Sequence, residues 1–203
     1  MHLGRIEAFS DGIFAVAATL LVLDLKVEHL TDVHSVSELK EALVEQLPRF
    51  FSWLISFVIV CKFWINHHHI LGLAKHATYG MVWLNSIFLM FQSLVPFPTA
   101  LMGGYPENRL AVSLFGVVMA LNTLLFIALH AYILRHLLKP ELEGTQDPLV
   151  IRKSFLGVAS YLAGVAAAWV SVKITFVIYA ATPLLFIVPT AARPPAKPAG
   201  SEK

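Results

Sequence analysis

The sequence predicts an all-α membrane protein with six transmembrane helices per chain. Its composition is 57% hydrophobic and only 14% charged, whereas soluble domains carry about 25% charged residues. The apolar residues also gather in separate runs, and a helix of about 20 apolar residues crosses the roughly 30 Å hydrocarbon core of a bilayer. The expected spans are residues 5–26, 48–71, 78–99, 109–137, 150–170 and 174–189.

The first span is the most informative because it carries Ser10 and Asp11 close to its start. An ionisable group at membrane depth costs several kcal/mol unless it finds a partner or water. At 100° per residue, the polar pair points away from a stripe of apolar residues. The stripe consists of Phe9, Ile13, Val16, Leu20 and Leu23, with Thr19 on its shoulder. We therefore expect Ser10 and Asp11 to face other protein segments, and the stripe to face either lipid or copies of itself around a symmetry axis.

A short amphipathic helix is expected over residues 37–47, near the membrane surface. It begins with an S-x-x-K pattern at Ser37 and Lys40, which lacks the acidic residue of a full capping box. The second span follows at once, since Pro48 suits the first turn of a helix.

The second span ends with three consecutive histidines, His67, His68 and His69. Neighbouring residues on a helix diverge by about 100°, so at most two of them share a site, and no metal centre is expected there. One histidine should instead face inward and hydrogen-bond to Asp11 or Ser10.

In the third span, Asn85 and Gln92 lie on one face, and Pro96 and Pro98 are expected to end the helix. The fourth span is interrupted only by Asn122 and His130. The fifth presents small residues that allow close helix packing: Gly157, Ser160, Gly164 and Ala168.

The expected domain organisation is a six-span transmembrane domain over residues 1–192 and a disordered cytoplasmic tail over 193–203, which is Pro-rich and polar. The connections on the side of the N-terminus hold more Lys and Arg than those on the other side, which predicts that both termini are cytoplasmic.

Several function classes find no support in the residues. The net charge of +2 is small and spread over the loops, so no nucleic-acid partner is expected. The lone Cys61 cannot form an intrachain disulfide. No G-x-S-x-G or H-E-x-x-H motif is present, which argues against an enzyme and against a bound cofactor.

Arg5, Phe9, Ser10 and Asp11 form the pattern RxxxFSD, followed by GIFAVAATLLVLDLK. This pattern resembles the signature of the transmembrane-protein-175 family of potassium channels. FWINHHHI at 63–70 and LNSIFLMFQSLVPFPT at 84–99 resemble the family's second and third helices, and the resemblance covers most of residues 1–190. It implies a homotetramer in a bacterial or archaeal plasma membrane, with three further copies of the chain and the lipid bilayer as partners.

The resemblance also implies a potassium-preferring cation channel whose central pore is lined by the first helix of each copy. Its hydrophobic constriction would be formed by Val16, Leu20 and Leu23, with the hydroxyl of Thr19 near the permeant potassium ions. The T-V-G-Y-G loop of carbonyl-lined filters is absent, so an apolar ring would have to act by size and dewetting. The implied interhelical network consists of Arg5, Phe9, Ser10, Asp11, His67, His68 and Asn85.

Two other classes compete with a channel. A proton-coupled or ion-coupled secondary transporter would use Asp11 and the histidines of the second span, but the inverted repeats and broken helices that favour a transporter are not evident. A membrane enzyme or redox protein would bind haem or metal through histidines such as His67 and His130.

Overall fold

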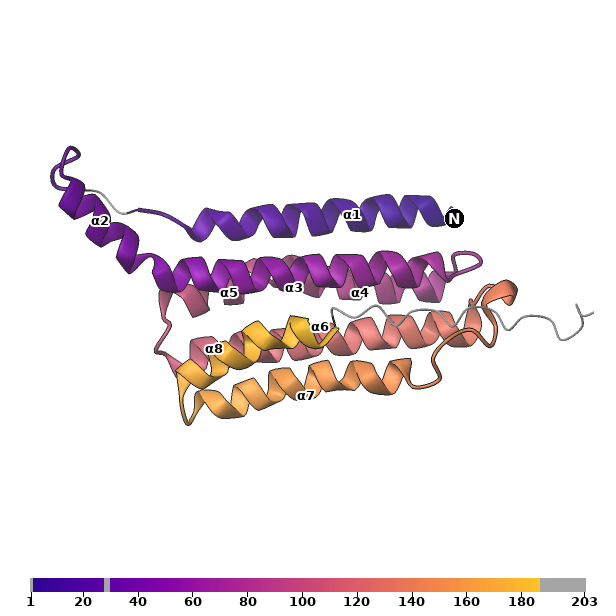
Figure 1. Cartoon of the computed structure of the whole chain (residues 1–203). Coiled ribbons are helices and arrows are strands. Elements are labelled where there is room, and N and C mark those ends of the chain that lie inside the picture. Colours follow the sequence, from indigo (N-terminus) through magenta and orange to yellow (C-terminus); the bar gives the residue numbers. More distant parts are fainter. Residues whose placement is uncertain (1, 28–29, 187–203) are drawn as a thin grey trace, which may run out of the picture.

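A computed structural model describes residues 2–27 and 30–186, and within these ranges the chain is all-helical, as predicted. The main helices run roughly along one direction and lie side by side (Figure 1). They are α1 (Leu3–Leu20), α2 (Val36–Glu45), α3 (Leu47–Gly72), α4 (Tyr79–Leu94), α5 (Pro96–Gly104), α6 (Arg109–His136), α7 (Val150–Ala168) and α8 (Val172–Ala181). Three short 3₁₀ helices are η1 (Leu21–Asp24), η2 (Pro140–Leu142) and η3 (Thr182–Phe186).

Five helical segments of the described chain are long and apolar enough to cross a membrane: Leu3–Asp24, Leu47–Gly72, Tyr79–Gly104, Arg109–His136 and Val150–Ala168. They correspond to the first five expected spans. The sixth begins with α8, where only the shorter apolar helix Val172–Leu184 is found. The expected end of this span and the tail 193–203 lie outside the described residues.

Pro96 and Pro98 break the helix as predicted, since α4 ends at Leu94, but the apolar segment does not end there: the candidate span Tyr79–Gly104 continues through α5. Val95 keeps helical angles, with φ −51° and ψ −39°, and α5 continues from Pro96 to Gly104. A proline in the first turn of a helix is tolerated because the N–H that it lacks would have no partner there. Thr99 of α5 then donates a hydrogen bond from Oγ1 to Ser56 Oγ of α3, at 2.8 Å.

The start of α2 also differs from the S-x-x-K prediction. Ser35 is the N-cap, and its Oγ accepts a hydrogen bond from the backbone N–H of Glu38. The Glu38 carboxylate in turn accepts hydrogen bonds from the backbone N–H groups of Asp32 and Thr31, which lower the pKa of Glu38. The start of α2 is therefore capped by Ser35 and Glu38 in an S-x-x-E pattern, two residues earlier than the expected Ser37.

The core of the bundle lies around α6, which packs against α4, α5 and α7. On the far side, Tyr179 of α8 lies over Gly164 and Gly116, and its hydroxyl donates to the carbonyl of Val112 at 3.2 Å. A methyl group on Gly164 would come within 2.2 Å of Tyr179, so the predicted close packing on this face of α7 is present.

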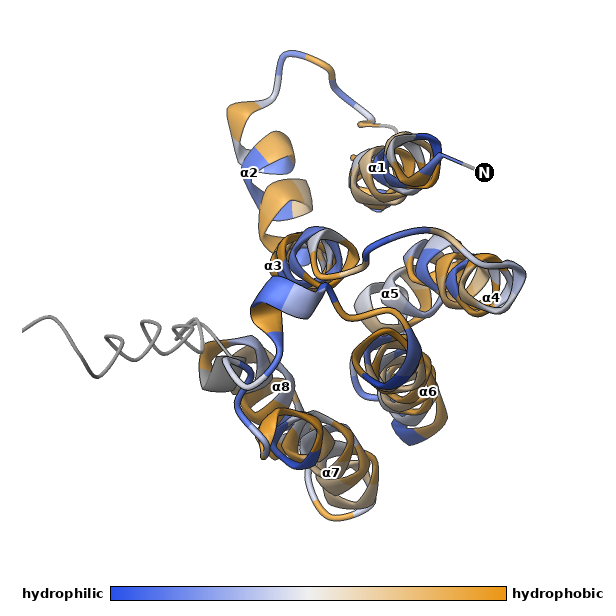
Figure 2. Cartoon of the chain, turned by 90° about the vertical axis from the view of Figure 1, so that its right-hand side faces the viewer, coloured by the Kyte–Doolittle hydropathy of each residue, from blue (hydrophilic) through white to orange (hydrophobic). Residues whose placement is uncertain are grey.

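Helix α1 lies at the opposite end of the bundle from α7, as the end-on view shows (Figure 2). It packs mainly against α3 and α4. Because no described element covers its remaining side, α1 presents a long surface to its surroundings.

Candidate functional site

Helix α1 has one buried and one exposed face, and the division follows the helical period. The buried face consists of Ile6, Ser10, Phe14, Ala17 and Leu21, each 4% exposed or less. The exposed large apolar residues are Phe9 at 61%, Val16 at 56% and Leu20 at 43% on α1, followed by Val22 at 46% and Leu23 at 59% on η1. Ile13 is half-buried. The stripe predicted from the sequence is therefore the outer face of α1 in a single chain.

Hydrogen bonds between buried polar side chains join α1 to α3 and α4. His67 Nε2 of α3 lies 2.6 Å from Asn85 Oδ1 of α4, and Asn85 Nδ2 donates to Ser10 Oγ at 3.1 Å. Ser10 donates onward to the carbonyl of Ile6 at 2.8 Å. Since the amide oxygen of Asn85 only accepts, His67 is the donor in this contact, through Nε2–H.

Aromatic side chains pack around the hydrogen-bonded residues His67 and Asn85 and hold the His67 ring in place. The ring of His67 stacks on Phe88 at 5.5 Å between centroids and lies 5.4 Å from Phe14. His67 and Asn85 are 1% and 2% exposed. The three helices are thus joined by a closed polar cluster inside an aromatic shell, and this cluster sets the rotation of α1.

Asp11 has a different partner from the predicted histidine. The indole Nε1 of Trp64 on α3 donates to Asp11 Oδ1 at 2.8 Å, and both side chains are exposed. The expected bond between a histidine and Asp11 is not formed, and His67 reaches Ser10 only through Asn85. The sequence reasoning missed Trp64, although an indole N–H on the helix that carries the histidines is a suitable donor.

The other residues of the expected network lie at the surface of the chain. Arg5, Phe9 and His68 are exposed. No hydrogen bond joins the side chains of Arg5 or His68 to any residue within 2–27 or 30–186.

Thr19, which adjoins the stripe, is exposed. Its hydroxyl donates to the carbonyls of Ala15 at 3.0 Å and Val16 at 2.9 Å. With the proton directed into the helix, the lone pairs of the oxygen point outward. Thr19 therefore presents an acceptor, which is the kind of group that a cation binds.

A second buried polar pair was not predicted. Asn122 of α6 donates from Nδ2 to Gln92 Oε1 of α4 at 2.5 Å, and both side chains are fully buried. Both residues stood out in the sequence as amides within apolar spans, which was the signal for a contact. Among the described residues, no group of three or more His, Cys, Asp or Glu is arranged to hold a metal ion.

The described chain is a bundle of membrane-length helices, and one helix has a long apolar face that no other element covers. These features define a multi-pass membrane protein. Comparison with known proteins narrows this class to channels. Residues 5–96 match the family model described as "Endosomal/lysosomal potassium channel TMEM175". A potassium channel of Chamaesiphon minutus is 34% identical over 86% of this chain and 90% of the relative. A potassium channel of Streptomyces collinus is 34% identical over 85% of each chain.

A solved structure agrees with these matches. The crystal structure of a lysosomal potassium-selective channel TMEM175 homolog from Chamaesiphon minutus is 32% identical, with a TM-score of 0.77 over 91% of this chain and 96% of that one. The chain belongs to the TMEM175 family. Because this is a family of channels, the protein is not an enzyme, and the secondary-transporter alternative is not favoured.

Proposed function

We propose that four copies of this chain surround a central pore that prefers potassium, and that the outer face of α1 lines this pore. One observation carries the proposal. Each copy exposes the apolar stripe of α1, while the polar cluster of Ser10, Asn85 and His67 holds the opposite face against α3 and α4. The names of the relatives, which are potassium channels, support potassium as the permeant ion.

The constriction in this proposal is formed by rings of Val16, Leu20 and Leu23. These side chains bring no ligands for an ion, so they select by pore width and by the cost of removing water. Val16 has a smaller side chain than the Leu residues of the other two rings. The smaller Val16 leaves a wider first ring, and we expect weaker discrimination against sodium than in a filter of backbone carbonyls.

Thr19 is the proposed cation contact beside these rings. Its outward lone pairs replace part of the hydration shell of a potassium ion, while its proton stays bonded to the carbonyls of Ala15 and Val16. The ion itself is the permeant substrate, and the proposal requires no cofactor.

Neighbouring copies of α1 have a suitable contact surface next to the stripe. Ala8, Gly12, Ala15 and Thr19 are all exposed, and a methyl group on Gly12 would meet no atom of its own chain within 4 Å. Small residues on a membrane helix allow another helix to approach closely. This line supports helix contact between copies around the pore.

The proposal places six spans in a bacterial or archaeal plasma membrane, with α8 and η3 leading into the sixth. The N-terminus lies at the same end of the bundle as the α3–α4 and α6–α7 connections (Figure 1). These connections and the helix ends beside them carry Lys75, Arg135, Lys139, Arg152 and Lys153. Basic residues concentrate on the cytoplasmic side of membrane proteins, so this end and both termini are the proposed cytoplasmic side.

Potassium flux into liposomes, measured with purified protein under an opposing sodium gradient, tests this function. Leu20→Asn should increase flux and lower the potassium-to-sodium ratio, because an amide hydrates the constriction. Leu121→Asn on α6 is the matched control, since Leu121 is 41% exposed and Leu20 is 43% exposed. Equal effects of the two substitutions would remove Leu20 from the pore, and an inactive wild-type protein would overturn the channel proposal.

A further inference from the structure

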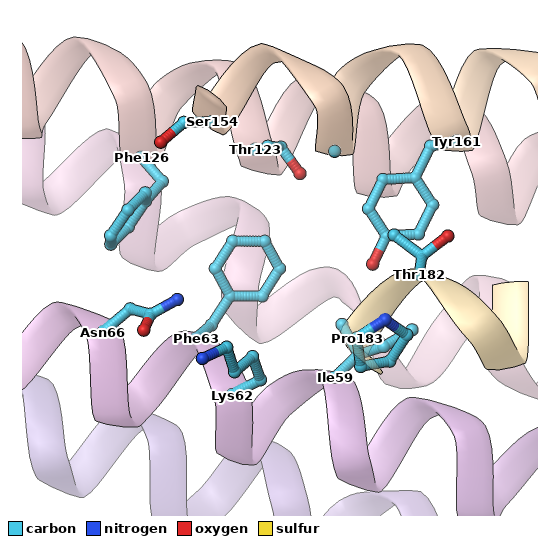
Figure 3. Close-up of a pocket in the computed structure, with 11 residues that line it drawn as sticks. Ile59, Lys62, Phe63, Asn66, Thr123, Phe126, Ser154, Tyr161, Thr182 and Pro183 are labelled. Carbon is cyan, nitrogen blue, oxygen red and sulfur yellow. The ribbon is translucent and has the colours of Figure 1, made fainter. Parts of the chain in front are cut away.

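A second polar site lies away from α1, in a cavity of about 60 Å³ between α3, α6, α7 and η3. Figure 3 shows the side chains around it, which combine apolar residues such as Ile59, Phe63 and Phe126 with several polar ones. Lys62 and Asn66 of α3 lie on one side, and Thr123 of α6 and Ser154 of α7 lie on the other. We call this cavity the Lys62 crevice.

Lys62 lies deep in a membrane-length helix. It precedes Gly72, the last residue of α3, by about 15 Å along the axis. Among the residues that the structure describes, none makes a hydrogen bond or an ion pair with its ammonium group, and the crevice lining contains no Asp or Glu. An intramembrane lysine without a counter-charge is costly, so a partner of opposite charge from outside the chain would stabilise it.

The crevice favours an anion over a cation. Ser154 and Thr123 direct their hydroxyl protons to their own helices, at 2.9 Å from the Val150 carbonyl and 2.8 Å from the Met119 carbonyl. The side chains with free donors are therefore Lys62, Asn66 and Tyr161, and no bond from Asn66 or from the Tyr161 hydroxyl to another described residue is present. One positive charge with an adjacent amide repels potassium and suits an oxygen-rich anion.

We propose that the Lys62 crevice binds an anionic phospholipid, with its phosphate at Asn66 and Lys62 and an acyl chain along the apolar side near Ile59. Asn66 lies about 9 Å before the end of α3, between Lys62 and the membrane boundary, and the long lysine side chain reaches toward it. The same end of the bundle carries exposed Arg152 at the start of α7. Basic pockets between membrane helices bind anionic head groups on the cytoplasmic side, which is the side proposed above for this end of the bundle.

A lipid fits this site better than a soluble anion, because the surface of the lining is mainly apolar and the crevice lies at membrane depth beside α3. The inference concerns lipid binding and does not depend on conduction through α1. A failed flux assay would therefore not contradict the lipid-binding proposal. Likewise, an absence of lipid binding would not contradict the pore proposal.

The test is native mass spectrometry of the delipidated, purified full chain, titrated with phosphatidylglycerol and with phosphatidylcholine. Wild-type protein should prefer phosphatidylglycerol and retain one molecule per chain. Lys62→Gln should reduce this preference about tenfold, as expected for the loss of a hydrogen bond to a charged group. Asn66→Leu, which keeps the volume, should reduce it less, and the thermal stabilisation by phosphatidylglycerol should fall in the same order.

Lys173→Gln is the matched control, because Lys173 is exposed at the start of α8 and does not line the crevice. Its preference for phosphatidylglycerol should equal that of the wild type. Three results would overturn the proposal: equal binding of the two lipids by the wild type, no change in both crevice variants, or an equal loss in Lys173→Gln. If Lys62→Gln does not fold, Asn66→Leu decides the question by the same comparison.

Discussion

The substitution Asn85→Leu tests the polar cluster that holds α1 in place. It keeps the volume of the side chain and removes both the acceptor of His67 and the donor to Ser10. Hydrogen bonds between membrane helices contribute about 0.6 kcal/mol on average and at most about 1.7 kcal/mol. Losing two of them should lower the free energy of unfolding by about 1–3 kcal/mol, and α1 should detach from α3 and α4 first.

The assay is reversible unfolding in mixed micelles at increasing concentration of a denaturing detergent. It is followed by circular dichroism and by the intrinsic fluorescence of the four tryptophans, one of which, Trp64, contacts α1. Ser86→Ala is the matched control, because Ser86 lies one residue further along α4 and bonds only to the carbonyl of Val82, at 2.8 Å. It should stay within about 0.5 kcal/mol of the wild type. Refutation would be an Asn85→Leu variant as stable as Ser86→Ala, since the cluster would then not fix the rotation of α1.

Two further predictions concern the contact between copies and the start of α2. Gly12→Leu should leave the fold of the single chain intact, because a methyl group there would meet no atom of its own chain within 4 Å. It should abolish the proposed tetramer, whereas Gly12→Ala should be tolerated. Light scattering in detergent measures the assembly, and a Gly12→Leu protein that assembles like the wild type would contradict the contact. Because backbone hydrogen bonds lower the pKa of Glu38 below its ordinary value of 4.5, its stabilisation of the α2 start should be complete above that pH and disappear as the pH falls through the lowered value. Amide hydrogen exchange at Thr31 and Asp32 measures this loss of the cap. In Glu38→Gln the pH dependence of the exchange protection should be absent. Wild-type protection that does not change with pH would exclude the proposed cap.

The two faces of α1 could be predicted from the sequence because they follow directly from the helical period. The buried Ser10 and the exposed Val16 and Leu20 lie where the wheel places them. Asn85 was also a candidate, since an amide within an apolar span needs a partner.

The specific partners could not be predicted in the same way. Which of three consecutive histidines faces inward depends on the rotation of α3, and the structure selects His67. The bond between Asp11 and Trp64 depends on the relative heights of α1 and α3. Pro96 separates α4 from α5 as predicted, but the end of the apolar span could not be predicted from it, because a proline in the first turn of a helix allows the next helix to begin at once.

The most direct test of the central claim, that the outer face of α1 lines the pore, is thiol modification. In a Cys61→Ala background, Leu20→Cys and the control Leu121→Cys would be exposed to a membrane-impermeant, water-soluble thiol reagent while potassium flux is recorded. The pore proposal predicts that the reagent blocks flux through Leu20→Cys and leaves Leu121→Cys unchanged. Unmodified, fully active Leu20→Cys protein would mean that this face of α1 contacts lipid, and the claim would be wrong.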